Sequence, residues 1–227
     1  MMSFKKIIRS LQLTGLEPVS REFGYDRGQP IDRYFIENFL DRRRQDIRGR
    51  VLEIGDPGYT RKFGSEKVTQ SDVLHSESGH SHVTIVGDLA TGKGLADQCF
   101  DCMILTQTLP FIYDIHGVVA NTYAKLRCGG VLLATLPGIS QVSRYDMDRW
   151  GDFWRFTDAS ARRLFGDVFG DDNVTVEIWG NVFVASAFLY GLASRELSQS
   201  ELDYVDADYQ VLITVRAVKK IECDSSL

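Results

Sequence analysis

Three acidic residues, Glu53, Asp72 and Asp88, each close a short run that predicts a β-strand. The carboxyl ends of neighbouring parallel strands meet at one edge of a sheet, so we expect the three carboxylates to lie together. Asp72 follows Glu53 by about 20 residues, the spacing at which dinucleotide-binding folds place an acid on the ribose hydroxyls. Asp88 would then meet an adenine amino group. Three acids favour a cationic nucleoside without phosphates, because they would repel the pyrophosphate of NAD.

A glycine turn follows the first of these acids, in the stretch VLEIGDPGY at residues 51–59. Gly55 and Gly58 allow the backbone to turn sharply and to approach a ligand closely. Their spacing does not match the GxGxxG dinucleotide fingerprint, and the sequence contains no G-x4-G-K-[ST] phosphate-binding loop. The turn therefore supports a nucleoside site rather than a phosphate site.

The cysteines and histidines do not predict a metal site. Cys99 and Cys102 have CxxC spacing, but they lie in a run that predicts a buried strand, and no second ligand pair accompanies them. His75, His80 and His82 lie in a predicted loop without fixed geometry. Unpaired thiols suit a reducing compartment, so we predict a cytoplasmic protein without a bound metal.

Charge and hydropathy exclude several other classes. A net charge of −5 over 227 residues argues against nucleic acid as a partner. The N-terminus lacks the features of a signal peptide, and the most apolar run, 182–193, is too short to span a bilayer. A small molecule is the expected partner, and a homo-oligomer is compatible with the sequence.

The elements that must position these residues alternate between strands and helices from residue 50 onward. This alternation predicts a single α/β domain over 1–227, with a mostly parallel sheet covered on both faces. Residues 1–48 are expected to form an N-terminal helical cap, with a short helix at 3–12 and a main helix that begins at Pro30. Strands are predicted at 50–54, 67–72, 82–88, 100–108, 131–137, 173–179 and 209–218, and helices at 114–127, 181–193, 198–203 and, with Thr157 as N-cap, to Phe169.

The order of motifs resembles the class I S-adenosylmethionine (SAM)-dependent methyltransferases over about residues 48–218. It is carried by EIGDPGY, SDVL, VGDLA, FDCMILTQTLPFIYD, LRCGGVLLATLPG and YQVLITVRA. More narrowly, SRYDMDRWGDFWRFT at 143–157 and FGYDRGQPIDRYFIENFL at 23–40 resemble a bacterial subgroup often associated with glycosyltransferases. Asp56-Pro57 departs from the small residues usual between the motif glycines, and Cys128 replaces a usual proline.

The resemblance implies a Rossmann-like doubly wound sheet of seven strands, mostly parallel with an antiparallel last strand. It also implies SAM as cofactor, with Glu53 near the methionine amino group, Asp72 at the ribose and Asp88-Leu89 at the adenine. Thr106, Gln107 and Thr108 would line the path of the methyl group. The full set of predicted cofactor-binding residues is Glu53, Gly55, Asp56, Asp72, Val73, Asp88, Leu89, Thr106, Gln107 and Thr108.

The acceptor is expected over the ends of the fourth and fifth strands, near the polar segment 143–155. Its carboxylates and arginines can bind hydroxyl groups, and its aromatic faces suit sugar rings; the alternative is a salt-bridged surface segment anchored by a tryptophan. An alcohol acceptor also needs a base, for which Asp148 and Asp146 are the candidates, with His116 in support. The predicted acceptor-binding residues are Arg144, Tyr145, Trp154 and Arg155.

Three functions remain open at this point. The leading hypothesis is an O-methyltransferase acting on a small molecule, with a sugar or glycoconjugate hydroxyl suggested by family analogy. The second is an N-methyltransferase acting on an amine or amino sugar, which would not need a strong base. The third is a SAM-binding protein without catalytic activity that serves a partner enzyme.

Overall fold

The computed structural model describes residues 15–221, so the helix predicted at 3–12 lies outside the described residues. Seven strands form one sheet in the order β3-β2-β1-β4-β5-β7-β6. β7 runs antiparallel to β5 and β6, and the other pairs are parallel, which confirms the predicted Rossmann-like fold. The strands are β1 (Gly49–Ile54), β2 (Val68–His75), β3 (Ile85–Val86), β4 (Phe100–Thr106), β5 (Leu126–Pro137), β6 (Val174–Trp179) and β7 (Leu212–Val218).

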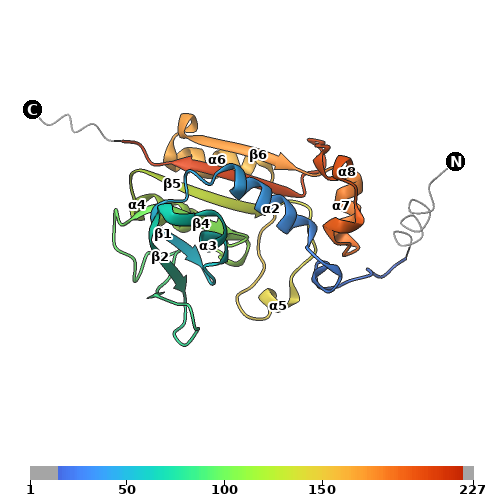
Figure 1. Ribbon diagram of the computed structural model, residues 1–227, viewed down its shortest axis with the longest axis horizontal. Helices are drawn as coiled ribbons and strands as arrows, with labels where there is room; N and C mark the ends of the chain where they lie inside the picture. The colour runs from blue at the N-terminus through green and yellow to red at the C-terminus, as the bar shows by residue number, and fades with distance from the viewer. Residues whose placement is uncertain (1–14, 222–227) are drawn as a thin grey trace, which may run out of the picture.

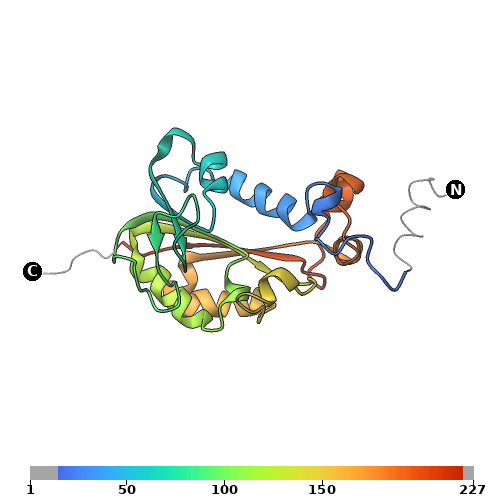
Figure 2. The ribbon, with the colours of Figure 1, turned by 90° about the horizontal axis from the view of Figure 1, so that it is seen from below.

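Helices cover both faces of the sheet, as Figures 1 and 2 show. α2, α3 and α7 lie over one face around Phe35 and Val51, and α4 and α6 lie over the other around Leu52 and Phe165. The α-helices are α2 (Ile31–Arg42), α3 (Gly58–Phe63), α4 (Ile115–Lys125), α5 (Arg144–Met147), α6 (Asp158–Phe169), α7 (Val182–Leu189) and α8 (Gln199–Asp203). Short 3-10 turns are η1 (Tyr25–Arg27), η2 (Ser65–Lys67), η3 (Leu109–Phe111), η4 (Asp171–Asn173) and η5 (Ser194–Glu196).

Several strand boundaries differ from the sequence prediction. β4 ends at Thr106 rather than residue 108, β5 begins at Leu126 rather than residue 131, and β7 begins at Leu212 rather than residue 209.

Two further differences affect the candidate site. β2 continues past Asp72 to His75, so Asp72 lies within the strand rather than at its end. β3 is only two residues long, because the chain turns at once into a loop closed by a hydrogen bond from the backbone N–H of Asp88 to the carbonyl of Lys93 (3.0 Å). His75 therefore holds the strand-end position that was predicted for Asp72.

The helix boundaries follow local capping. Thr157 caps α6 as predicted, because its hydroxyl accepts the N–H of Ser160 while the Ser160 hydroxyl accepts the N–H of Thr157. The helix predicted over 181–193 begins after Asn181, whose side chain accepts the N–H of Val184, but it ends at Leu189. Among residues 15–221, no helix is long and apolar enough to cross a membrane.

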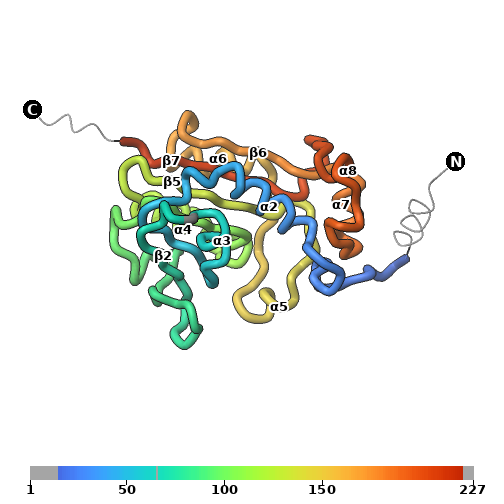
Figure 3. The backbone as a smooth tube through the Cα atoms, viewed as in Figure 1, coloured from blue at the N-terminus to red at the C-terminus, as the bar shows by residue number. Residues whose placement is uncertain are grey.

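Residues 19–29 are tied to a segment that lies far away in the sequence. The backbone N–H of Val19 donates to the carbonyl of Tyr190 (2.9 Å), and that of Ser194 donates to the carbonyl of Gln29 (2.8 Å). Arg27 Nε also donates to Glu196 Oε2 (2.9 Å). Figure 3 shows this N-terminal stretch running beside the α7–α8 region before it enters α2.

The Arg27–Glu196 pair makes the docking of this stretch pH-dependent. Burial raises the pKa of Glu196, but hydrogen bonds from Arg27 and from the N–H of Ala193 outweigh burial, so the pKa lies below its ordinary 4.5. We expect Glu196→Gln to lower the free energy of unfolding by about 1 kcal/mol above that pH. The difference should shrink as the pH falls further, because the wild-type carboxylate then becomes protonated. Urea unfolding at several pH values measures it.

Asp41→Asn is the control, since Asp41 forms an ion pair with Arg44 in which both side chains are about half exposed. Exposed pairs contribute little, so this variant should match the wild type at every pH. Equal acid dependence in Glu196→Gln and wild type would contradict the assignment.

Candidate functional site

A cavity of about 930 Å³ opens above the carboxyl ends of β1, β2, β4 and β5. Ile54 and Gly55 line it from β1, and Leu74 to Ser76 line it from β2. Residues 106–108 contribute from the end of β4, and parts of 137–155 contribute from the segment after β5. Parts of residues 21–25 and the first turn of α2 close another side. The cavity therefore lies where the chain order of the strands reverses, between β1 and β4.

Ten of the residues predicted from sequence line this cavity. They come from both the predicted cofactor side and the predicted acceptor side. They are Gly55, Asp88, Leu89, Thr106, Gln107, Thr108, Arg144, Tyr145, Asp146 and Arg155.

Glu53 does not line the cavity, because its carboxylate binds the start of α3. Its oxygens accept the backbone N–H groups of Tyr59 (3.1 Å) and Thr60 (2.8 Å) and the Thr60 hydroxyl (2.7 Å). Burial raises the pKa of Glu53, and these hydrogen bonds only partly offset it. Glu53 therefore ties the end of β1 to the start of α3 and so stabilises the glycine turn between them.

Asp72 is likewise engaged inside the protein. It is 4% exposed and accepts hydrogen bonds from Arg50 Nε (2.7 Å), Gln70 Nε2 (3.0 Å) and the Thr84 hydroxyl (2.9 Å). The neighbouring Val73 is also buried away from the cavity. At the end of this strand the cavity is lined by His75, which the sequence analysis had assigned to a loop.

The glycine turn meets the cavity at Gly55. Its φ is +79°, which favours glycine, and a Cβ placed there would meet no protein atom within 4 Å. Asp56 points elsewhere, since its carboxylate accepts the N–H of Gly58 (2.8 Å) and does not line the cavity. The Asp56-Pro57 departure is thus accommodated by a local turn, and the backbone of Gly55 remains open to a ligand.

Gln107 at the end of β4 has a strained backbone. Its φ is +50°, a left-handed value that is uncommon for any residue except glycine. Its N–H donates to the Thr135 carbonyl on β5 (3.0 Å), which holds the backbone in this conformation. Strain of this kind is common at functional sites, and here it lies in the cavity wall.

A buried carboxylate organises segment 143–155. Asp152 has a side chain that is 2% exposed and accepts the N–H of Ser143 (3.0 Å) and the Nη2 of Arg155 (2.9 Å). Burial raises its pKa, but these hydrogen bonds outweigh burial, so the pKa lies below the usual range. Ser143 is the N-cap of α5, and its hydroxyl also donates to the Asp146 carboxylate. These hydrogen bonds fix the conformation of segment 143–155, which forms one wall of the cavity.

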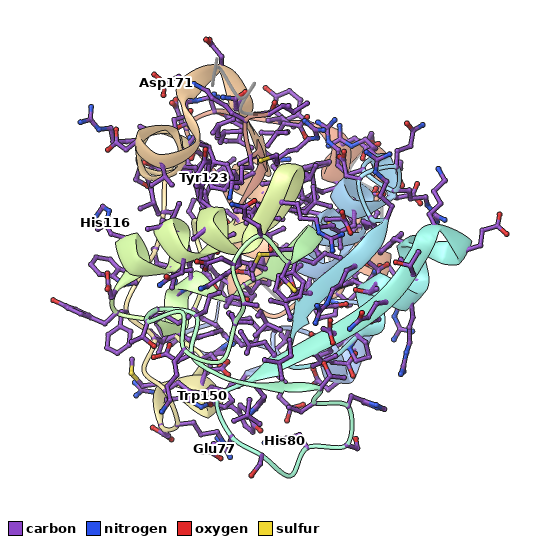
Figure 4. All side chains as sticks on the ribbon, turned by 90° about the vertical axis from the view of Figure 1, so that its left-hand side faces the viewer. Glu77, His80, His116, Tyr123, Trp150 and Asp171 are labelled. Carbon is purple, nitrogen blue, oxygen red and sulfur yellow. The ribbon has the colours of Figure 1, made fainter. Side chains whose placement is uncertain are left out.

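Three predicted acceptor-side residues do not line the cavity. Asp148 is exposed beyond α5, and His116 lies on the outer side of α4, well apart from Trp150 in Figure 4. Trp154 packs on the core and donates from Nε1 to the carbonyl of Ile112 (3.2 Å), so it anchors the segment. Trp150 lines the cavity instead, with its ring 6.5 Å from that of His75.

Four residues that precede β1 line the cavity without having been predicted to do so. Arg21 and Tyr25 come from the N-terminal stretch, and Asp32 and Arg33 come from the first turn of α2. The motif FGYDRGQPIDRYFIENFL contains three of them, but in the sequence it carries only a resemblance and no assigned chemistry. Within the described part of the chain, no group of three or more His, Cys, Asp or Glu side chains could hold a metal ion.

Solved structures share this fold, although no protein-family model and no curated protein matches the chain. A SAM-dependent methyltransferase from Archaeoglobus fulgidus is 12% identical with a TM-score of 0.54, over 82% of this chain and 94% of that one. The N-methyltransferase NodS from Bradyrhizobium japonicum, solved with S-adenosylhomocysteine, is 13% identical with a TM-score of 0.53, over 96% and 99%. A SAM-dependent methyltransferase from Thermotoga maritima is 15% identical with a TM-score of 0.52, over 96% and 98%. The chain therefore has the class I methyltransferase fold.

The strain at Gln107 predicts an unusual order of stabilities. Glycine accepts a positive φ without cost, whereas alanine does not, so Gln107→Gly should be more stable than Gln107→Ala by about 1 kcal/mol. Thermal or urea unfolding of the two variants measures this. At Gln70, which lies in the extended strand β2, the same pair of substitutions should show the opposite order. The same order at both positions would contradict a left-handed Gln107.

Proposed function

We propose that this protein is a SAM-dependent methyltransferase that acts on a small-molecule acceptor. The observation that carries the proposal is the open backbone of Gly55 beneath a cavity at the switch point between β1 and β4. A ligand can approach the main chain there as closely as a nucleoside cofactor requires. The solved structures with this fold, one of them bound to S-adenosylhomocysteine, support the same cofactor.

The residues along the cavity suit the parts of this cofactor. Asp88 and Leu89 lie beyond β3 and would hold the adenine, with His75 at the end of β2 facing the ribose. Thr106, Gln107 and Thr108 at the end of β4 would line the path to the acceptor. SAM supplies a methyl group that its sulfonium has already activated. The protein must therefore bring the two reactants into contact and exclude water.

The acceptor is proposed to bind against segment 143–155. Tyr145 and Trp150 present exposed rings to the cavity, and Arg144 and Asp146 present hydrogen-bonding groups. This combination suits a hydroxylated ring, which supports a sugar or glycoconjugate acceptor and transfer to oxygen. Asp146 and Asp152 both line the cavity, but the Asp152 carboxylate is already bound by Arg155 and by the N–H of Ser143. We therefore propose Asp146 as the base that removes the hydroxyl proton.

Transfer to nitrogen is the second candidate. Asp146 and Asp88 could bind an ammonium acceptor, and NodS, an N-methyltransferase, shares the fold. An amine needs no strong base once it is deprotonated, so removal of the Asp146 charge should raise the Michaelis constant of an amine acceptor, whereas it should lower the turnover number of a hydroxyl acceptor. Mass spectrometry of the product then identifies the methylated atom.

The cofactor assignment predicts that S-adenosylhomocysteine binds and raises the melting temperature. At 100 times its dissociation constant it should stabilise the fold by about 2.7 kcal/mol. Gly55→Ala should weaken this binding at least about tenfold, because the new methyl group enters the cavity. Calorimetric titration measures both effects.

Gly79→Ala is the matched control. Gly79 also has a positive φ, +102°, and also has open space around it, but it does not line the cavity. Both variants should lose about 1 kcal/mol of stability from backbone strain, and only Gly55→Ala should lose affinity. Failure of the wild type to bind S-adenosylhomocysteine at millimolar concentration would refute the proposed function.

The proposed base predicts a contrast between two nearby acids. Asp146→Asn should lower turnover of a sugar acceptor by about 100- to 10,000-fold, because the proton acceptor is lost. Asp148→Asn should leave turnover unchanged, since Asp148 lies outside the cavity. Each variant is incubated with SAM and candidate sugars or amines, and the methylated products are quantified by mass spectrometry. Equal turnover in the two variants would exclude Asp146 as the base.

A further inference from the structure

Two adjacent side chains of opposite charge line the cavity from the first turn of α2. Asp32 is 9% exposed and Arg33 is half-buried. Although they are neighbours in the sequence, they form no ion pair with each other or with any other side chain among residues 15–221. A buried carboxylate and a half-buried guanidinium that face a cavity without a direct ion pair leave hydrogen-bonding capacity for a ligand, which points to a ligand that carries both opposite charges.

Neutral hydroxyl groups hold Arg33 in place. Its Nε donates to the Tyr25 hydroxyl (2.9 Å) and its Nη1 donates to the Tyr59 hydroxyl (3.1 Å). Burial lowers the pKa of Arg33, but the nearby Asp32, Tyr59 and Tyr25 outweigh it, so the net pKa is raised and the guanidinium stays charged. No partner for Nη2 is found in the described part of the chain. The guanidinium is therefore oriented and keeps a donor for an anion.

The Asp32 carboxylate is bound only by nearby backbone. Its Oδ1 accepts the backbone N–H of Arg33 (2.8 Å), its own N–H also stabilises the carboxylate, and no side chain among residues 15–221 donates to it. Burial raises the pKa of Asp32 above its usual value, and the Arg33 charge and the backbone hydrogen bonds offset this only in part. A cationic group bound at Oδ2 would stabilise the ionised carboxylate further.

Other charges around the cavity do not form such a pair. Arg155 is bound to Asp152, and Arg21, Glu22 and Arg144 are exposed. Glu53, which the family resemblance implies near the amino group, has both oxygens bound to the start of α3. Tyr59, which contacts Arg33, belongs to that same helix, directly after the glycine turn. Asp32 and Arg33 therefore lie at the β1 side of the cavity, next to the proposed cofactor site.

We propose that Asp32 binds the ammonium group and Arg33 binds the carboxylate group at the aminoacyl end of the cofactor. An α-amino acid carries these two charges on one carbon, so two fixed, opposite and adjacent side chains match it. This inference rests on the proposed function, because it assigns one end of the same ligand. It also replaces Glu53 with Asp32 as the partner of the amino group.

The test compares two ligands on the full chain by calorimetric titration. S-adenosylhomocysteine carries the aminoacyl end, and 5′-methylthioadenosine has the same thioether-linked adenosine without it. The wild type should bind S-adenosylhomocysteine at least about tenfold more tightly than methylthioadenosine. Arg33→Gln and Asp32→Asn should each weaken S-adenosylhomocysteine about 10- to 100-fold and leave methylthioadenosine within about threefold, because only the charged end is affected.

Arg21→Gln is the matched control, since Arg21 lines the cavity but is exposed and carries no role in this assignment. It should leave the ratio of the two affinities unchanged. An unchanged ratio in folded Arg33→Gln and Asp32→Asn would overturn the inference while the proposed function stands. Equal wild-type affinity for the two ligands would overturn it without any variant. If neither ligand binds to the wild type, the proposed function fails as well.

Discussion

The structure depends on the parallel pairing of β1 with β4 at the centre of the sheet. β2 and β3 lie on one side of this pair and β5 lies on the other, so the chain leaves the two central strands in opposite directions. A crevice at their carboxyl ends is the geometric consequence. The open backbone of Gly55 and the strained backbone of Gln107 both lie at this crevice, one at the end of each central strand.

The carboxylates around the crevice divide into two groups with different tasks. The side chains of Glu53, Asp72 and Asp152 are buried. Glu53 accepts hydrogen bonds from the start of α3, Asp72 joins β2 to β1, and Asp152 holds the loop of segment 143–155. Asp32 and Asp146 are partly satisfied inside the protein and also face the cavity. A buried charge is tolerated where it is hydrogen-bonded, so the first group stabilises the cavity wall and the second is available to ligands.

The N-terminal stretch completes the cavity from outside the sheet. Backbone hydrogen bonds to Tyr190 and Ser194, together with the Arg27–Glu196 pair, dock it against the region around α7 and η5. This docking brings Asp32 and Arg33 over the β1 side, where Tyr25 and Tyr59 orient the guanidinium. The proposed aminoacyl site thus depends on contacts between segments separated by more than a hundred and fifty residues.

The sequence alone determined the features that depend on short-range physics. The strand and helix order, the Thr157 cap, the glycine turn and the presence of a polar segment after β5 all follow from local patterns and hydrogen bonds. Only the tertiary structure decided which acids face the cavity, because strand register and side-chain pairing are long-range. Arg50 on β1 binds Asp72 within β2, which no spacing in the sequence reveals. The same holds for Asp32 and Arg33, which reach the cavity only because the N-terminal stretch docks on the far end of the chain.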